Sequence, residues 1–226
     1  MQKKFEFIPM KNMGMIFGTL VHETLEDINR MTFNREDISY EKIEEIFAEN
    51  YRNMQKKYKM NIEKEILITG IESIADYYNN YSEIYNNIKD IEIKLSLVKE
   101  KYILEGIIDL VTEREGILEI VDFKTGKRRG NEKVYINQLE IYAYLLKERY
   151  GREIRKGKLF YLGEEKENRI TEIEFTEKRL KEAVRNFDET AEKILLEDFT
   201  CNFDESNEPC SSCCFREYCR AEIGNH

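Results

Sequence analysis

The sequence predicts an α/β fold, and three observations carry this prediction. Apolar residues recur at helical spacing near both ends of the chain and alternate with polar residues in its middle. The 226 residues include only two prolines and eleven glycines, which favours long regular elements. Ile, Leu, Phe and Tyr recur throughout, which excludes a disordered chain although 36% of the residues are charged. A chain of this length can form one domain with a real core.

The first part of the chain predicts three helices. The clearest covers Met15–Met31, where apolar positions repeat every three or four residues. Two more polar helices are expected at roughly 36–58 and 62–81. The Asn- and Tyr-rich stretch 77–87 predicts a loop.

The apolar period then changes to two, as a half-buried strand requires. Ile91–Leu97 alternates apolar with polar residues, and two apolar runs follow at 102–111 and 117–123. The polar stretch 112–116 predicts the turn between these two strands of a β-meander.

The last part of the chain returns to helical spacing. A helix is expected at 135–150, short strands at 158–162 and 170–175, and a final helix capped by Thr176. The order of helices, three strands, helix, strands and helix is typical of an α/β architecture.

Targeting signals and cysteines bound the protein class. No run approaches the roughly eighteen apolar residues of a membrane helix, and residues 1–11 do not resemble a signal peptide, so a soluble, cytoplasmic protein is predicted. All five cysteines lie between Cys201 and Cys219, which disfavours a disulfide framework and suggests a local metal site.

Two carboxylates and a lysine interrupt strands that otherwise look like core. Asp109 and Asp122 stand inside apolar runs, and Lys124 shares the strand face of Asp122 because side chains alternate. If the strands form a hairpin, the carboxylates can lie side by side, and such a pair suits Mg²⁺. The lysine could then hold a nucleophile or stabilise a charged transition state. The alternative is a carboxylate in a turn and an ion pair at a sheet edge.

These residues, with two further segments, resemble the RecB-like branch of the PD-(D/E)xK nuclease superfamily. Gly106–Asp109 and Asp122–Gly126 are similar to its motifs II and III. Gly18–Glu23 resembles its helical motif, and Gln138–Ala143 its Q-x-x-x-Y motif. The C-terminal cysteines resemble the iron–sulfur clasp of AddB-type and CRISPR-adaptation nucleases.

The resemblance implies roles for individual residues. The metal, Mg²⁺ or Mn²⁺, would be bound by His22, Asp109, Asp122 and the backbone carbonyl of Phe123, and Lys124 would be the catalytic lysine. Gln138 and Tyr142 would orient this centre or the DNA, with packing as the alternative for both. Related enzymes often carry an acidic residue on the first strand, but the alternation around Glu92 predicts a solvent-facing side chain.

The resemblance also implies a restriction-endonuclease-like core, a mixed β-sheet flanked by helices, within one nuclease domain covering 1–226. The expected parts are a motif I helix (1–34), a helical insertion (35–90), the catalytic αβ core (91–175), a C-terminal helix (176–200) and the cysteine cluster (201–219).

The cysteine spacing predicts a site for zinc or an iron–sulfur cluster. Cys210, Cys213 and Cys219 are close enough in sequence for thiolate ligation, and spacing alone does not choose the metal. The family pattern implies a 4Fe–4S cluster in the intact protein, with a fourth, early cysteine that this sequence lacks. Either Cys201 or Cys214 supplies the fourth ligand, or the chain is a fragment that begins just after that cysteine and lacks the cluster.

The function implied is a metal-dependent DNA exonuclease, the nuclease domain of a helicase–nuclease in DNA repair and recombination. Its substrate would be single-stranded DNA or unwound duplex. No GxxxxGK[ST] phosphate loop occurs, so an ATP-driven helicase would be a separate domain or protein. The alternatives are a catalytically silent DNA-end-binding module and a zinc or iron–sulfur interaction module.

Net charge bears on the DNA prediction. The chain is formally −9, yet the segment 124–158 holds eleven Lys and Arg against four Asp and Glu. Lys127, Arg128 and Arg129 follow the proposed catalytic lysine and are the predicted DNA-binding residues. The alternative is a solvated basic face.

Overall fold

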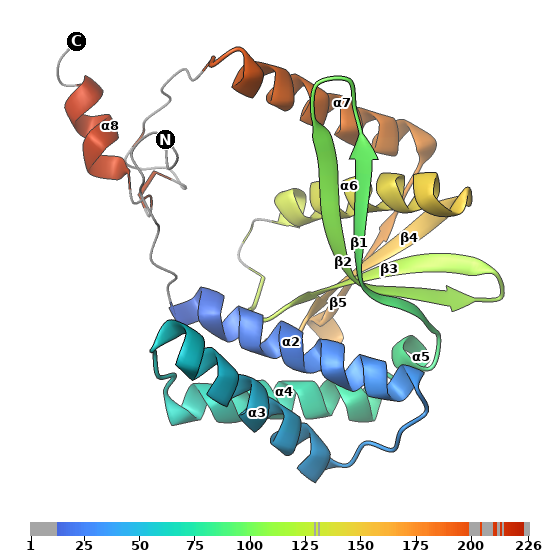
Figure 1. Ribbon diagram of the computed structural model, residues 1–226. Coiled ribbons are helices and arrows are strands. Elements are labelled where there is room, and N and C mark those ends of the chain that lie inside the picture. Colours follow the sequence, from blue (N-terminus) through green and yellow to red (C-terminus); the bar gives the residue numbers. More distant parts are fainter. Residues whose placement is uncertain are drawn as a thin grey trace. The chain divides into compact units, whose positions relative to one another are not determined.

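The computed structural model describes residues 13–128, 130, 132–198, 204, 210–211, 213 and 215–223 (Figure 1). The chain divides into two compact units, Asn12–Asn186 and a second that contains the residues from Phe187 onward. Each unit is considered by itself. Within the described ranges, no helix is both long and apolar enough to cross a membrane.

A five-stranded mixed sheet forms the centre of the first unit, with the strands in sequence order from β1 to β5. The pair β3–β4 is parallel and every other pair is antiparallel. The parallel pair requires a crossover, which α6 (Glu132–Tyr150) supplies. The strands are β1 (Ile88–Val98), β2 (Ile103–Arg114), β3 (Ile117–Lys124), β4 (Ile154–Tyr161) and β5 (Ile170–Glu174).

Helices cover both faces of this sheet and create two cores. On one side α2, α3 and α4 lie against each other and bury the first core with residues such as Val121 and Phe160 (Figure 1). On the other side α6 and the first part of α7 bury the second core with residues such as Ile120 and Leu159. The predicted mixed sheet flanked by helices is therefore confirmed. The remaining helices are α2 (Met13–Phe33), α3 (Tyr40–Tyr58), α4 (Lys64–Asn80), α5 (Ser82–Tyr85), η1 (Lys166–Asn168), α7 (Glu177–Leu195) and α8 (Arg216–Ile223).

The loop predicted at 77–87 is wrong, because helix α4 continues to Asn80 and α5 follows it. Tyr77 is fully buried, with the rings of Phe123 and Phe160 5.2 and 5.4 Å from its own. Its hydroxyl donates to Asn29 Oδ1 at 3.1 Å. This packing holds the segment in helical form despite a composition that is typical of loops.

Two boundaries show how local chemistry ends an element. The predicted turn at 112–116 is shorter than expected, because β2 continues to Arg114 and only Glu115 and Gly116, both at positive φ, form the turn. A two-residue turn with this backbone matches the twist of a hairpin. The predicted cap is confirmed, since Thr176 Oγ1 accepts from the N–H of Arg179 at 3.3 Å.

Candidate active site

The candidate site lies where the β1–β2 hairpin turns over. Ile91 packs in the α2–α4 core and Ile93 in the α6 core, although residues two apart on a regular strand share a face. Ile108 and Leu110 on β2 switch sides in the same way. Glu92, between the first pair, has a left-handed backbone with φ of 48°. This conformation breaks the alternation and costs energy in a non-glycine residue.

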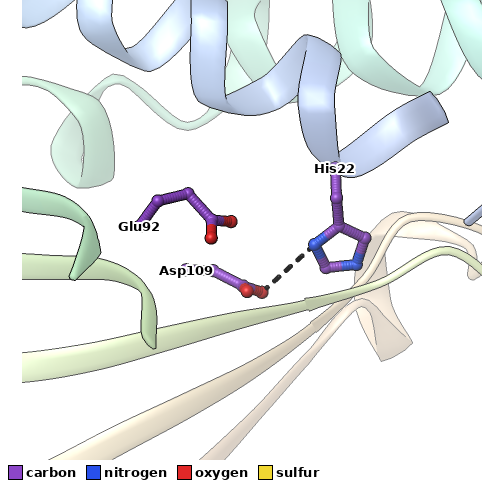
Figure 2. A group of neighbouring side chains, drawn as sticks. All are labelled: His22, Glu92 and Asp109. Carbon is purple, nitrogen blue, oxygen red and sulfur yellow. Dashed lines mark ion pairs between the residues drawn. The ribbon is translucent and has the colours of Figure 1, made fainter. Parts of the chain in front are cut away.

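Three side chains meet at this point of inversion. His22 from α2, Glu92 from β1 and Asp109 from β2 each offer a ligand atom, and these atoms lie within 4.8 Å of one another. Figure 2 shows the imidazole and the Glu92 carboxylate directed toward Asp109 from opposite sides. His22 Nδ1 is 3.5 Å from Asp109 Oδ2. The site therefore joins the helical layer to the sheet.

The strands β2 and β3 separate at the same level. Their backbone pairing runs only as far as Leu110 and Val121. One step further, the Asp109 carboxylate accepts the N–H of Phe123 at 2.8 Å, so a side chain replaces the sheet partner. Continuing this register places Asp109 opposite Asp122, as the hairpin prediction required. The Phe123 ring is buried in the α2–α4 core, which fixes the backbone on which its carbonyl stands.

A second group of residues links β3 to α6. Lys124 Nζ lies 2.6 Å from Asp122 Oδ2 and donates to Gln138 Oε1 at 3.3 Å. Gln138 Nε2 donates to the Tyr142 hydroxyl at 2.8 Å. The ring of Tyr135 lies beneath the ammonium, 4.2 Å from Nζ to its centroid. The helix thus holds the lysine from the side opposite to Asp122.

The close approach of α6 explains a glycine on β2. A Cβ on Gly106 would stand 2.7 Å from Tyr142 Cε1, closer than side chains approach each other. The glycine therefore makes room for the tyrosine ring beside the site.

Burial and like charges shift the titration of the site. Burial, with Asp109 and Glu26 nearby, raises the pKa of Glu92 to about 7. Burial and Asp109 raise the pKa of Asp122 to about 6, although Lys124 and His22 oppose the change. Burial alone would lower the pKa of His22, but the surrounding carboxylates outweigh it and raise that pKa above its ordinary value.

The donor set fits a divalent cation. Among the described residues, no donor meets hydrogen-bond geometry at the buried Oδ2 of Asp122, so this oxygen lacks a full partner although the lysine is close. One imidazole nitrogen and several carboxylate oxygens are ligands that Mg²⁺ or Mn²⁺ accepts. A cation at this position would relieve the repulsion among the carboxylates.

The structure brings together the residues predicted around the metal, and it adds one. Glu92, which the alternation assigned to solvent, is half-buried and faces His22 and Asp109, so that prediction is wrong. The cause is its positive φ, which the hydropathy pattern does not reveal. An acidic residue at that place in the first strand was the one available signal.

The predicted DNA-binding residues differ in their surroundings. Lys127 lines a cavity beside Lys124. The guanidinium of Arg128 lies over the Tyr161 ring and donates to the carbonyl of Asn168 at 2.6 Å. Arg129 lies outside the described residues.

The cysteine segment is described only in part, and Cys201 and Cys214 lie outside that part. Cys210 and Cys219 are half-buried, and Cys213 is exposed. The Cys213 N–H donates to the carbonyl of Cys210 at 3.2 Å, and the Phe215 N–H donates to Cys213 Sγ at 3.4 Å. A turn that directs N–H groups at sulfur is compatible with a thiolate ligand.

Comparisons with known proteins agree with this geometry. A family model described as the PD-(D/E)XK nuclease superfamily matches residues 9–220. An ATP-dependent helicase/nuclease protein of Clostridium novyi, one subunit of its enzyme, is 29% identical over 160 residues, which are 65% of this chain and 12% of that protein. The protein of the same description from Carboxydothermus hydrogenoformans is 36% identical over 76 residues, 31% of this chain and 6% of that protein. The chain therefore spans a small part of the length of these relatives.

A solved structure supports the fold. The crystal structure of a proposed exonuclease from Eubacterium rectale superposes with a TM-score of 0.58 at 14% sequence identity. The match covers 94% of this chain and 79% of that one.

Proposed function

Because the chain belongs to the PD-(D/E)XK nuclease superfamily, we propose that it is a Mg²⁺- or Mn²⁺-dependent deoxyribonuclease that degrades DNA as an exonuclease. The observation that carries the proposal is the buried Asp122 oxygen without a hydrogen-bond donor among the described residues, 2.6 Å from the Lys124 ammonium. A carboxylate kept in this state costs stability, which is expected at a catalytic centre.

The roles of the residues follow from their positions. His22, Asp109, Asp122 and the carbonyl of Phe123 would hold the metal, with Glu92 as an additional ligand. A divalent ion at such a site acts as a Lewis acid and lowers the pKa of a bound water. Its ligands come from α2, β1, β2 and β3, so folding of both layers assembles them.

Lys124 supplies positive charge where charge develops on the phosphate oxygens during hydrolysis. Gln138 orients the ammonium, and Tyr142 in turn orients the Gln138 amide. Donors held in place before the reaction stabilise a transition state without the cost of reorienting them.

We assign the chain to the nuclease part of a helicase–nuclease in DNA repair and recombination, as one nuclease domain over 1–226. The support is the description of its relatives as ATP-dependent helicase/nuclease proteins, of which the chain matches 12% and 6%. A helicase domain or a partner helicase would then be the source of unwound DNA.

Cleavage of end-labelled, linear single-stranded DNA tests the proposal. The wild-type chain should release short products in Mg²⁺ or Mn²⁺, and chelation should stop the reaction. Asp122→Asn and Lys124→Ala should each reduce kcat by about 100-fold or more, because each removes a group that acts in the transition state. A circular single strand should stay intact if the enzyme requires an end.

Two further variants sharpen this test. Glu119→Gln, on the same strand as Asp122, changes a carboxylate that pairs with Lys158 and should leave kcat within a few fold of wild type. The proposal fails if wild type and the site variants are equally inactive with both metals. Cleavage of the circular strand would retain the nuclease and reject the exonuclease.

We propose a 4Fe–4S cluster on Cys210, Cys213, Cys219 and Cys201, with zinc as the alternative and Cys214 as another source of the fourth ligand. The sulfur-directed N–H of Phe215 supports a thiolate at Cys213. Anaerobically purified protein should bind about four irons per chain and absorb broadly in the visible range. Stoichiometric zinc would replace the cluster by a zinc site, and the absence of both metals would overturn the proposal.

A further inference from the structure

A cavity of about 630 Å³ lies beside Lys124. The N-terminal end of α2, the segment after β3 and the first turns of α6 contribute its walls. Its lining includes the aromatic residues Phe17, Tyr135 and Tyr161 and the cations Lys124 and Lys127. None of the described residues that line it is acidic.

This lining differs from that of the metal centre next to it. The metal centre gathers carboxylates, whereas the cavity offers rings and ammonium groups. Its volume lies within the range of about 300–1,000 Å³ that is usual for small-molecule ligands. Aromatic faces combined with cations are the combination that proteins use to bind the bases and phosphates of single-stranded nucleic acid.

A second observation points to a ligand at this place. Tyr161 is 1% exposed, and its hydroxyl has no hydrogen-bond partner among the described residues. Leaving a buried hydroxyl without a partner costs free energy, which a bound polar group would recover. Tyr161 lines the cavity together with Tyr135.

We infer that this cavity is a subsite for one unpaired nucleotide beside the scissile bond, with its base against Tyr135 and Phe17 and its phosphate at Lys127. The inference rests on the proposed function and specifies the substrate as single-stranded DNA. A base in a duplex is stacked and paired, so it must leave the helix before it can enter a cavity. An unpaired nucleotide enters without that cost.

Abasic scanning by fluorescence anisotropy tests the subsite in Ca²⁺, a hard cation that binds the same kinds of oxygen ligands. The probe is a single-stranded oligodeoxynucleotide of about ten nucleotides in which one base at a time is removed. Loss of one particular base should weaken binding about five- to a hundredfold, the range expected for one base stacked on aromatic rings. Loss of other bases should have smaller effects.

Two substitutions assign the effect to the cavity. Tyr135→Phe keeps the ring and should keep the sensitivity to the missing base. Tyr135→Leu removes the ring and should bind the intact and abasic strands equally within about twofold, because both changes remove the same contact. Tyr144→Leu is the matched control, since Tyr144 lies on α6 outside the cavity lining and has Lys99 over its ring at 5.8 Å.

Three results would overturn the inference: equal sensitivity to every base, unchanged base sensitivity in Tyr135→Leu, or equal affinity for a blunt duplex. These measurements need no cleavage. A chain that shows the expected pattern but hydrolyses no DNA would keep the subsite and lose the nuclease function. A chain that cleaves DNA without the pattern would do the reverse.

Discussion

At the scale of single residues, Glu92 combines a left-handed backbone with a perturbed carboxyl group. Its φ is 48°, and burial together with Asp109 raises its pKa to about 7. Both features cost stability in the metal-free protein, and both belong to a side chain that faces the candidate metal ligands. The fold tolerates them because packing on each side of the hairpin fixes the backbone at this point.

The first prediction concerns the pH dependence of the metal-free protein. A carboxyl whose folded pKa is raised favours folding below its unfolded pKa of about 4.5, and that contribution is lost as the pH rises through about 7. Glu92→Gln mimics the protonated form. In a chelator at about pH 8 it should raise the free energy of unfolding by on the order of 1–2 kcal/mol, a value discounted for partial exposure.

Urea unfolding at about pH 5 and 8 measures this effect. At the lower pH the variant and wild type should be nearly equal. Glu105→Gln, on the same hairpin and paired with Lys94 at the surface, should differ little from wild type at either pH. A destabilised Glu92→Gln at pH 8 would show that the carboxylate does not destabilise the fold.

The second prediction concerns Gly106 and Gly18. Gly106→Ala would place a Cβ 2.7 Å from the Tyr142 ring, so the ring must move and overpacking should cost about 1–3 kcal/mol. In Gly18→Ala the nearest atom to the new Cβ is Thr125 Oγ1 at 3.6 Å, an ordinary contact, and an alanine in helix α2 should be neutral or stabilising by up to about 1 kcal/mol. Thermal or urea unfolding of the two variants would contradict this interpretation if the order of their stabilities were reversed.

At the scale of elements, α6 connects the sheet, the site and α7. It presents Tyr135, Gln138 and Tyr142 to the site, three and four residues apart on one face. On another face Glu140 is buried and pairs with Arg179 of α7, with Nη2–Oε1 and Nε–Oε1 distances of 2.7 and 2.8 Å. The position of the lysine and the packing of α7 therefore depend on the same helix.

The third prediction follows from this pair. Arg179→Ala leaves the Glu140 carboxylate buried without its cation and should destabilise the protein by about 1–3 kcal/mol, less than a fully buried pair because Arg179 is partly exposed. Adding Glu140→Leu should recover part of the loss. Arg155→Ala, which breaks an exposed pair with Glu153, is the control and should change stability by less than about 0.5 kcal/mol. Equal effects of the two arginine substitutions in urea unfolding would refute a special role for the buried pair.

At the scale of the whole molecule, the basic segment does not form one basic surface. Many of its cations face carboxylates from other parts of the chain, and only some lie near the site. Lys124 and Lys127 are the cations of this segment that line the cavity beside the site. Ion pairs with acidic partners are formed by Lys147 with Glu177, Arg152 with Glu113, and Lys158 with Glu119.

The fourth prediction is a weak salt dependence of DNA binding. Each phosphate contact with a single strand contributes about 0.7 to the slope of log K against log salt concentration, so two lysines should give a slope of about −1.4. Contacts from the whole segment, with its excess of seven positive charges, would give about −5. Anisotropy titrations at several salt concentrations distinguish these values, and Lys127→Ala should reduce the slope by about 0.7.

The order of the helices and strands could be predicted from the sequence, as could the residues gathered around Asp109, Asp122 and Lys124. Apolar periodicity reports which side of an element is buried, and this depends mainly on neighbours along the chain. Carboxylates and a lysine inside apolar strands stand out against that pattern. His22, Gln138 and Tyr142 were found through their resemblance to motifs, and the structure places them beside the same centre.

The tertiary structure alone decided the features that depend on residues far apart in the chain. The helical state of Tyr77 comes from its packing on Phe123 and Phe160, which overrides a composition typical of loops. The inward position of Glu92 comes from a hairpin that turns over between two cores, which period-two alternation cannot express. The cavity beside Lys124 likewise exists only where α2, β3 and α6 meet, because its walls come from segments more than 100 residues apart.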